Sequence, residues 1–145
     1  MDVMTPAQRR KAMQSNRGRT KPERKLAASV WRSGLRFLTA EGYRSRFGRR
    51  CLGNPDLIFT RKRVAVFVDG CFWHCCPDHY QQPVQNAAYW RSKAAMNCER
   101  DLAVAKKLRY LGWRVVRIWE HEIEGDLTGT ADRIVREVKS TQARA

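Results

Sequence analysis

The side chains with the greatest potential for chemistry lie together in one short segment, Cys71–His79. The segment contains three thiols, two imidazoles and two large aromatic rings, and it directly follows the apolar run Val64–Asp69. Thiolates and imidazoles at this density are typical of a zinc site. Aromatic rings on the same segment suit stacking on a flat ligand such as a nucleic-acid base. The segment therefore predicts a loop that a metal ion holds in place and that presents rings to a base.

A structural zinc ion takes four ligands in a tetrahedron. Cys71, Cys76 and His79 supply three of them. His121 is the fourth candidate, because it follows a predicted strand that lies beside the strand leading into the loop. Cys75 is adjacent to Cys76, and two neighbouring thiolates cannot easily face one ion, so we assign Cys76. The alternative is a cysteine-rich loop without a metal.

Two carboxylates flank the predicted hairpin that leads into this loop. Asp56 begins its first strand and Asp69 ends its second, so an antiparallel pairing brings the two close together. Carboxylate and carbonyl oxygens are the ligands that Mg²⁺ prefers. Asp56 can equally be an ordinary turn residue. The basic surface and the neighbouring histidine favour the magnesium site.

His74 is a candidate general base, because an imidazole beside a metal-bound carboxylate can deprotonate an attacking water. It lies three residues from Cys71 and can also serve as a zinc ligand. Glu23, at the start of a predicted helix, has two possible roles. Capping that helix is the role its position favours. Holding a metal-bound water requires that the helix end face Asp56.

Phe72, Trp73 and Trp90 are the candidate stacking residues. A pair of rings on a metal-fixed loop can wedge between base pairs and unstack one step at a cost of a few kcal/mol. Aromatic residues are usually part of the core, and we expect this of Trp113 and Trp119.

The chain is strongly basic, with a formal net charge of +15, and the charge is uneven. Residues 1–63 hold 17 Lys/Arg and 4 Asp/Glu, whereas residues 64–145 hold 12 and 10. A surplus this one-sided costs self-repulsion and predicts a polyanionic partner, with a merely solvated charged face as the alternative. Residues 1–19 are expected to form a flexible basic arm, or a short helix that orders on its partner, and to contact DNA. The arm residues assigned to DNA contact are Met13, Asn16, Arg17 and Arg19.

The remaining composition indicates one soluble α/β domain over residues 20–140, with a disordered tail at 141–145. No apolar run approaches the roughly 20 residues of a membrane span, and the N-terminus lacks a signal core. We therefore expect a cytoplasmic protein that does not bind membranes. We also expect a monomer, which associates with the nucleoid when it acts on DNA. Cys51 and Cys98 stand apart and are expected to be ordinary, largely buried thiols.

Periodicity predicts the elements that position these residues. The expected helices span 20–34, 94–111 and 130–139. Strands are expected at 37–40, 56–59, 64–69 and 113–119. An irregular phosphate-facing loop or a hairpin is expected at 42–54, and another loop at 77–89. The run 64–68 should be a central strand covered on both faces, and it should lie parallel to 113–119. The predicted core faces of the helices are Leu26, Ala27, Val30 and Trp31; Leu102, Ala105, Leu108 and Leu111; and Ala131, Ile134, Val135 and Val138.

Four segments together resemble the Vsr family of DNA endonucleases, which act in very-short-patch mismatch repair. They are Met13–Glu23, Asn54–Leu57, Val66–His74 and Leu111–His121, and the resemblance covers about residues 7–138. It implies a restriction-endonuclease-like fold of the PD-(D/E)xK type, a mixed central sheet flanked by helices. It also implies a nick in double-stranded DNA, 5′ of the thymine in T:G mismatches that arise by deamination of 5-methylcytosine. Mg²⁺ would be the catalytic metal and zinc a structural one.

Carried over by position, Asp56 looks like the magnesium-binding aspartate and His74 like the catalytic base. Glu23 and Asp69 look like residues that hold water or support the metal, and Asp101 matches an aspartate that supports the site. The resemblance also matches the three stacking aromatics to intercalating residues and the four zinc-ligand candidates to zinc ligands. Other mismatch-repair proteins are further expected partners. Two rival functions remain: a restriction-type endonuclease of this fold that cuts both strands at a matched site, and a non-catalytic zinc-stabilised DNA-binding module.

Two positions depart from the family pattern. Asp69 stands where some members carry histidine, so a proton-transfer role cannot be transferred to it, and its carboxylate can bind the metal directly instead. Cys75 stands where glycine is frequent, which introduces a competing thiol.

Overall fold

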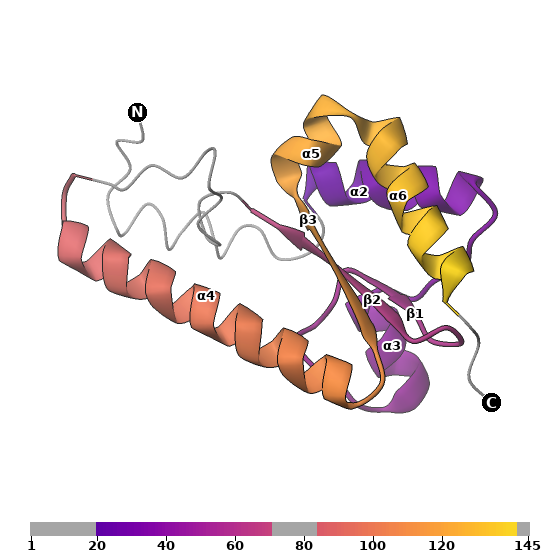
Figure 1. The fold of residues 1–145 in the computed structure, drawn as a ribbon, viewed down its shortest axis with the longest axis horizontal. Coiled ribbons are helices and arrows are strands. Elements are labelled where there is room, and N and C mark those ends of the chain that lie inside the picture. Colours follow the sequence, from indigo (N-terminus) through magenta and orange to yellow (C-terminus); the bar gives the residue numbers. More distant parts are fainter. Residues whose placement is uncertain (1–19, 71–83, 142–145) are drawn as a thin grey trace.

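A computed structural model describes residues 20–70 and 84–141 of the chain. The described part is a mixed α/β unit built on a three-stranded sheet of order β1-β2-β3 (Figure 1). Strand β1 is antiparallel to β2, and β3 is parallel to it. The elements are α2 (Lys21–Arg32), α3 (Ala40–Phe47), β1 (Leu57–Phe59), β2 (Val64–Asp69), α4 (Ala87–Tyr110), β3 (Arg114–Trp119), α5 (Glu120–Gly125) and α6 (Leu127–Ser140).

Strand β2 is the centre of the fold, and helices cover both of its faces. Val64 and Val66 belong to a hydrophobic core with α2, α5 and α6. Ala65 and Phe67 point to the opposite face and pack with Leu108 of α4. Successive side chains of a strand alternate between faces, so this near-continuous apolar run fills both cores. The predicted central strand, the hairpin and the parallel pairing with β3 are confirmed.

Helix α2 begins as the sequence predicted. The side chain of Thr20 accepts a 3.4 Å hydrogen bond from the backbone N–H of Glu23, and a proline occupies the first turn. Leu26, Ala27 and Val30 are buried, but Trp31 is 46% exposed, so its assignment to the core was wrong. Its ring instead packs edge-on against Phe37, with centroids 5.5 Å apart.

The segment 37–54 differs most from the prediction. Leu38 makes only an isolated bridge to Ile58, and helix α3 then occupies the first part of the predicted irregular loop. Thr39 caps this helix by accepting from the N–H of Gly42 at 3.0 Å, and Gly48 ends it in the left-handed conformation at φ 69°. Both are ordinary cap residues, but α3 buries none of its own side chains and so has no apolar stripe to reveal it.

Helix α4 begins at Ala87, seven residues earlier than predicted, and extends past the sheet (Figure 1). Only part of it packs on the sheet, through Ala105 and Leu108. Leu102 is 72% exposed and Leu111 is also exposed, so those two core assignments were wrong. The short helix α5 was not predicted, and in α6 Val135 is only partly buried. Cys51 is buried and Cys98 is partly buried, as expected.

The described helices include none long and apolar enough to cross a membrane. Trp113 and Trp119 are each partly buried, and Trp113 packs against the core on the α4 side.

Candidate active site

The candidate site lies where β1 begins and β2 ends. The N–H of Asp56 donates to the carbonyl of Val66 at 2.8 Å, and the N–H of Val68 donates to Asp56 Oδ2 at 2.7 Å. The backbone of β2 therefore fixes the side chain of Asp56 and points it toward the end of the sheet, where Asp69 lies. The predicted approach of the two hairpin ends is confirmed.

A cavity of about 200 Å³ opens beside these carboxylates. It lies between the loop before β1, the end of β2, β3 and helix α4. Its charged and polar lining comprises Asn54, Asp56, Asp69, Arg100, Asp101 and Arg117.

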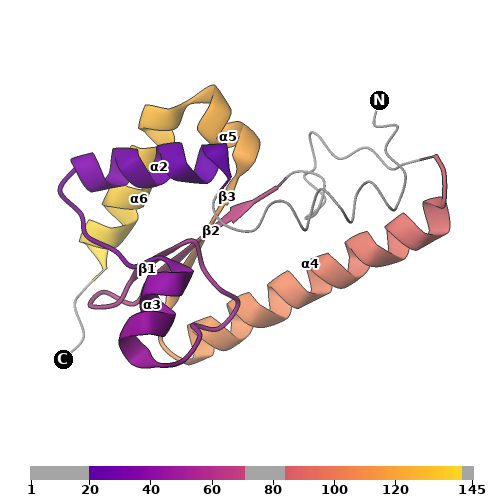
Figure 2. The same ribbon diagram turned by 180° about the vertical axis from the view of Figure 1, so that it is seen from behind.

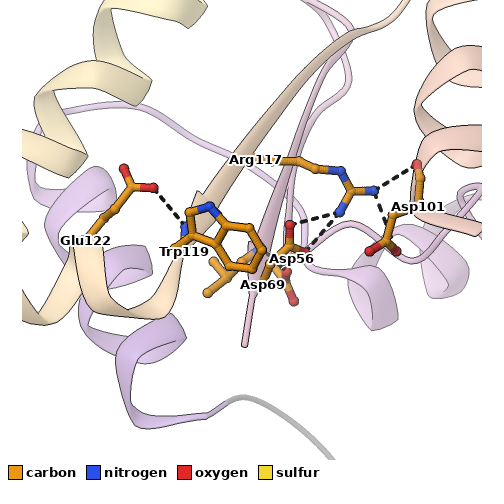
Figure 3. Close-up of polar contacts among 7 residues, drawn as sticks. Asp56, Asp69, Asp101, Arg117, Trp119 and Glu122 are labelled. Atoms are coloured by element: carbon orange, nitrogen blue, oxygen red, sulfur yellow. Dashed lines mark hydrogen bonds and ion pairs between the residues drawn. The ribbon is translucent and has the colours of Figure 1, made fainter. Parts of the chain in front are cut away.

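Arg117 of β3 joins two of the acids (Figure 3). Its Nη1 donates to Oδ1 and Oδ2 of Asp69 at 2.9 and 3.1 Å. Its Nη2 donates to the backbone carbonyl of Asp101 at 3.3 Å and lies 3.9 Å from that residue's carboxylate. The guanidinium also sits 4.5 Å from the ring centroid of Phe67. Arg117 thereby ties β2 and β3 to helix α4 at the cavity.

The surroundings of Asp56 disfavour its ionised form. Burial has the largest effect. The nearby negative charge of Glu23 acts in the same direction, and that of Asp69 does so more weakly. A side-chain hydrogen bond with Glu23 also favours the protonated acid, while the N–H of Val68 opposes these effects. Together they raise the pKa of Asp56 from 3.8 to about 7. The N-terminal end of α2 thus faces Asp56, which is the condition that a role for Glu23 beyond helix capping required.

The described residues contain no group of three or more His, Cys, Asp and Glu side chains arranged to enclose a metal ion by themselves. Mg²⁺ seldom needs such an enclosure. It usually keeps several waters and binds through one or two carboxylates.

The structure brings Glu23, Asp56, Asp69 and Asp101 of the predicted set to one end of the sheet. His121 is the second residue of α5 and is partly buried. Asp69 pairs in register with Trp119, so the chain leaves β2 beside the start of α5, as the zinc prediction requires. Trp90 is only 4% exposed, packed edge-on to Tyr89 at 5.0 Å, so its ring is not presented for stacking.

The other predicted site residues lie outside the described part of the chain. They are Met13, Asn16, Arg17 and Arg19 of the arm, and Cys71, Phe72, Trp73, His74, Cys75, Cys76 and His79 of the loop.

Comparison with known proteins identifies the family. Residues 1–82 match the family model for DNA mismatch endonuclease Vsr. The chain is 46% identical over 117 residues to the Type II nicking enzyme V.NaeI of Lentzea aerocolonigenes, covering 80% of this chain and 69% of that protein. It is 39% identical over 146 aligned residues to the Type II nicking enzyme V.NmeDIP of Neisseria meningitidis serogroup C, covering 98% and 93%.

This chain belongs to the Vsr family. A further relative, the DNA mismatch endonuclease Vsr of Escherichia coli (strain K12), is 32% identical over 126 residues, covering 86% of this chain and 76% of that protein. The mixed sheet and its helices agree with a Vsr nuclease fold, and the chain is a Vsr-family endonuclease.

Arg117 is the residue of this Vsr-family site that sequence reasoning missed. Period-two alternation places Phe67, Asp69 and, on the adjacent strand, Arg117 on the α4 side of the sheet. The available signal was a charged residue inside the apolar stretch Val115–Trp119 of β3, beside the strand that ends in Asp69.

Replacing Arg117 with Met should destabilise the protein by about 3 kcal/mol, because it leaves the carboxylate of the buried Asp69 without its cation. Urea unfolding measures this change. The control is Arg114→Met on the same strand, whose ion pair with Glu137 is exposed and should contribute about 1 kcal/mol or less. Adding Asp69→Asn to Arg117→Met should restore much of the loss. Equal losses for the two single variants, without recovery in the double variant, would contradict the assignment.

Replacing Asp56 with Asn should stabilise the metal-free protein increasingly as pH rises. A raised folded-state pKa contributes stability below the unfolded value of 3.8, and that stability is lost as pH rises through about 7. The variant cannot ionise, so its advantage should grow from pH 4 to pH 8, by a few kcal/mol.

Thermal unfolding in EDTA at pH 4 and pH 8 measures this advantage. Asp132→Asn, which removes an exposed carboxylate on α6, is the control and should change stability little at either pH. If the stability gain of Asp56→Asn were the same at pH 4 and pH 8, the surroundings of Asp56 would not disfavour its charged form.

Proposed function

We propose that this protein is a Mg²⁺-dependent endonuclease that nicks double-stranded DNA 5′ of the thymine in a T:G mismatch and so starts very short patch repair. The observation that supports this most strongly is Asp56, a carboxyl fixed on the sheet backbone in a cavity crowded with acids. The relatives' names support it in two ways: several are nicking enzymes, and one is a mismatch endonuclease.

The residues of the cavity fit Mg²⁺. Hard oxygen ligands suit this ion, and Asp56 carries a carboxyl whose ionisation is opposed by neighbouring negative charge. A bound divalent cation would instead favour the ionised carboxylate. We assign Asp56 as the ligand that holds the ion, with Asp69 as the second candidate. Because Asp69 already binds Arg117, we assign it the weaker hold on the metal.

When bound, Mg²⁺ supplies a Lewis acid that polarises the phosphoryl group and stabilises the leaving oxygen. The carboxylate of Asp56 would hold the ion, because a carboxylate alone would repel the scissile phosphate. Glu23, which shares a hydrogen bond with Asp56, orients water at the site. His74 takes the proton of the attacking water as general base. Arg117 acts through Asp69 and Asp101, keeping both carboxylates in place while the DNA backbone enters.

Mismatch preference would come from the rings of Phe72 and Trp73. A mismatched step is less costly to open than a matched one, so a wedge of two rings enters it more readily. We omit Trp90 from this wedge because its ring is buried.

We also propose a structural zinc ion held by Cys71, Cys76, His79 and His121. The closeness of the end of β2 to the start of α5 supports a ligand from each segment. Such an ion would fix the loop that carries His74 and the two rings relative to the carboxylates. In the cell we expect the protein to act as a cytoplasmic monomer on nucleoid DNA, with other mismatch-repair proteins downstream.

A nicking assay tests the proposal and separates it from its two rivals. With Mg²⁺, the wild type should nick one strand of a T:G duplex and leave the matched duplex intact. Asp56→Asn and His74→Ala should each lower the single-turnover rate by about 100-fold or more while binding DNA. Asp132→Asn is the matched surface control and should nick normally.

Cleavage of both strands of a matched duplex would favour the restriction-type enzyme instead. A protein stripped of metal that nicks no duplex after Mg²⁺ is returned would favour the DNA-binding module. Full activity in Asp56→Asn or His74→Ala would contradict the assigned roles.

Elemental analysis of the purified protein should find about one zinc ion per chain. His121→Ala should lower this content and the thermal stability, because three ligands hold zinc less well than four. Cys98→Ser, which changes a partly buried thiol outside the proposed site, is the control. Retention of a full equivalent of zinc in His121→Ala would remove this histidine from the ligand set.

A further inference from the structure

A second cavity, of about 470 Å³, lies at the other end of β1 from the site. It is bounded by the connection from α2 to α3, the end of α3, the turn after β1 and α6 (Figure 2 brings β1 and α3 forward). Its floor is apolar, with Phe37 and Phe59 among the lining residues. Its charged lining is entirely cationic: Arg36, Arg46, Arg61 and Lys62. We call this the β1-end groove.

The arginines of the groove contact no negatively charged group of the described residues. Arg36 lies 3.9 Å over the ring of Trp31, and its Nη1 donates to the carbonyls of Trp31 and Leu35 at 2.9 and 3.1 Å. Arg46 lies 5.5 Å from the ring centroid of Phe47. Both arginines contact uncharged groups, and Arg61 is exposed on the turn. Among the residues that the structure describes, none of these three arginines has a carboxylate partner.

Some cations elsewhere in the described chain do have carboxylate partners. Arg114 pairs with Glu137, Arg117 with Asp69, and Arg133 with Glu122. The Nζ of Lys62 donates to the carbonyl of Thr141, directly after α6, at 2.7 Å, a contact that joins the turn after β1 to the end of α6. Arg36, Arg46 and Arg61, which come from three separate elements, can be changed without breaking that contact.

We propose that the β1-end groove binds the phosphate backbone of the DNA duplex flanking the cleavage site. Three cations spread over three elements suit a line of phosphates better than one small anion. Exposed rings of Trp31 and Phe47 lie beside Arg36 and Arg46 and can pack against sugars. The proposal rests on DNA being the substrate, as the proposed function holds.

The length of β1 sets where this contact falls. Asp56 directly precedes the strand and Thr60 directly follows it, so the two ends are separated by about 13 Å at about 3.3 Å per residue. One turn of the duplex is about 34 Å long. The groove would therefore contact the backbone on one side of the nick and within one turn of it.

The experiment compares the triple variant Arg36→Gln/Arg46→Gln/Arg61→Gln with a control that loses the same charge from the exposed face of α6, Arg133→Gln/Arg136→Gln/Lys139→Gln. Affinity for T:G and matched duplexes is measured by fluorescence anisotropy in EDTA, from about 50 to 200 mM salt. The groove variant should bind about tenfold or more weakly, and the slope of log K against log salt should fall by about 2 to 3. The control should change both much less.

A second measurement locates the contact. Single neutral methylphosphonate linkages are placed one at a time at increasing distance on each side of the nick. They should weaken wild-type binding most at positions within one turn of the nick on one side, and at those positions they should not weaken binding by the groove variant any further. Single-turnover nicking at saturating DNA should keep its rate, because no replaced residue lines the catalytic cavity.

Equal losses in the groove variant and the control, or methylphosphonate effects that are the same in wild type and groove variant at every position, would overturn the proposal. Because Arg36 also bonds two backbone carbonyls, the double variant Arg46→Gln/Arg61→Gln is measured beside the triple one, together with thermal unfolding. A protein that shows the groove effect on both duplexes but never nicks would refute the proposed function and leave this inference standing.

Discussion

Negative charge gathers at one end of the sheet, and the rest of the site depends on how that charge is held. Asp56 is anchored by a backbone N–H of β2, with Glu23 and Asp69 close enough to oppose its ionisation. Ionising Asp56 in these surroundings lowers the stability of the metal-free protein at neutral pH. Features that lower stability occur mainly at functional sites. A divalent cation bound here would attract the carboxylates that otherwise repel one another.

The acids at this end of the sheet fall into two groups. Asp69 and Asp101 share the guanidinium of Arg117, which is fixed in turn over the ring of Phe67. Asp56 and Glu23 share a hydrogen bond with each other and oppose each other's charge. The first pair is a structural clamp between the sheet and α4. The second pair is where a cation changes the electrostatics most.

Much of the fold could be predicted from the sequence because its signals are local. The continuous apolar run of β2, the cap at Thr20 and the period-two pattern of β3 each follow from neighbouring residues. Helix α3 could not be found from an apolar stripe because it buries no side chain, and Leu102 looked like core because periodicity alone cannot show where α4 leaves the sheet. Asp56 and Asp69 were paired correctly from hairpin geometry, whereas Arg117 was missed because its partners come from other elements.

The central claim is that Asp56 resists ionisation in the metal-free protein and ionises readily once a metal binds. The most direct test is a pH titration of the Asp56 carboxyl carbon by NMR, with and without Mg²⁺. The account predicts a pKa near 7 in EDTA that falls clearly when Mg²⁺ is added. A pKa near the ordinary value of 3.8 that does not respond to Mg²⁺ would contradict it.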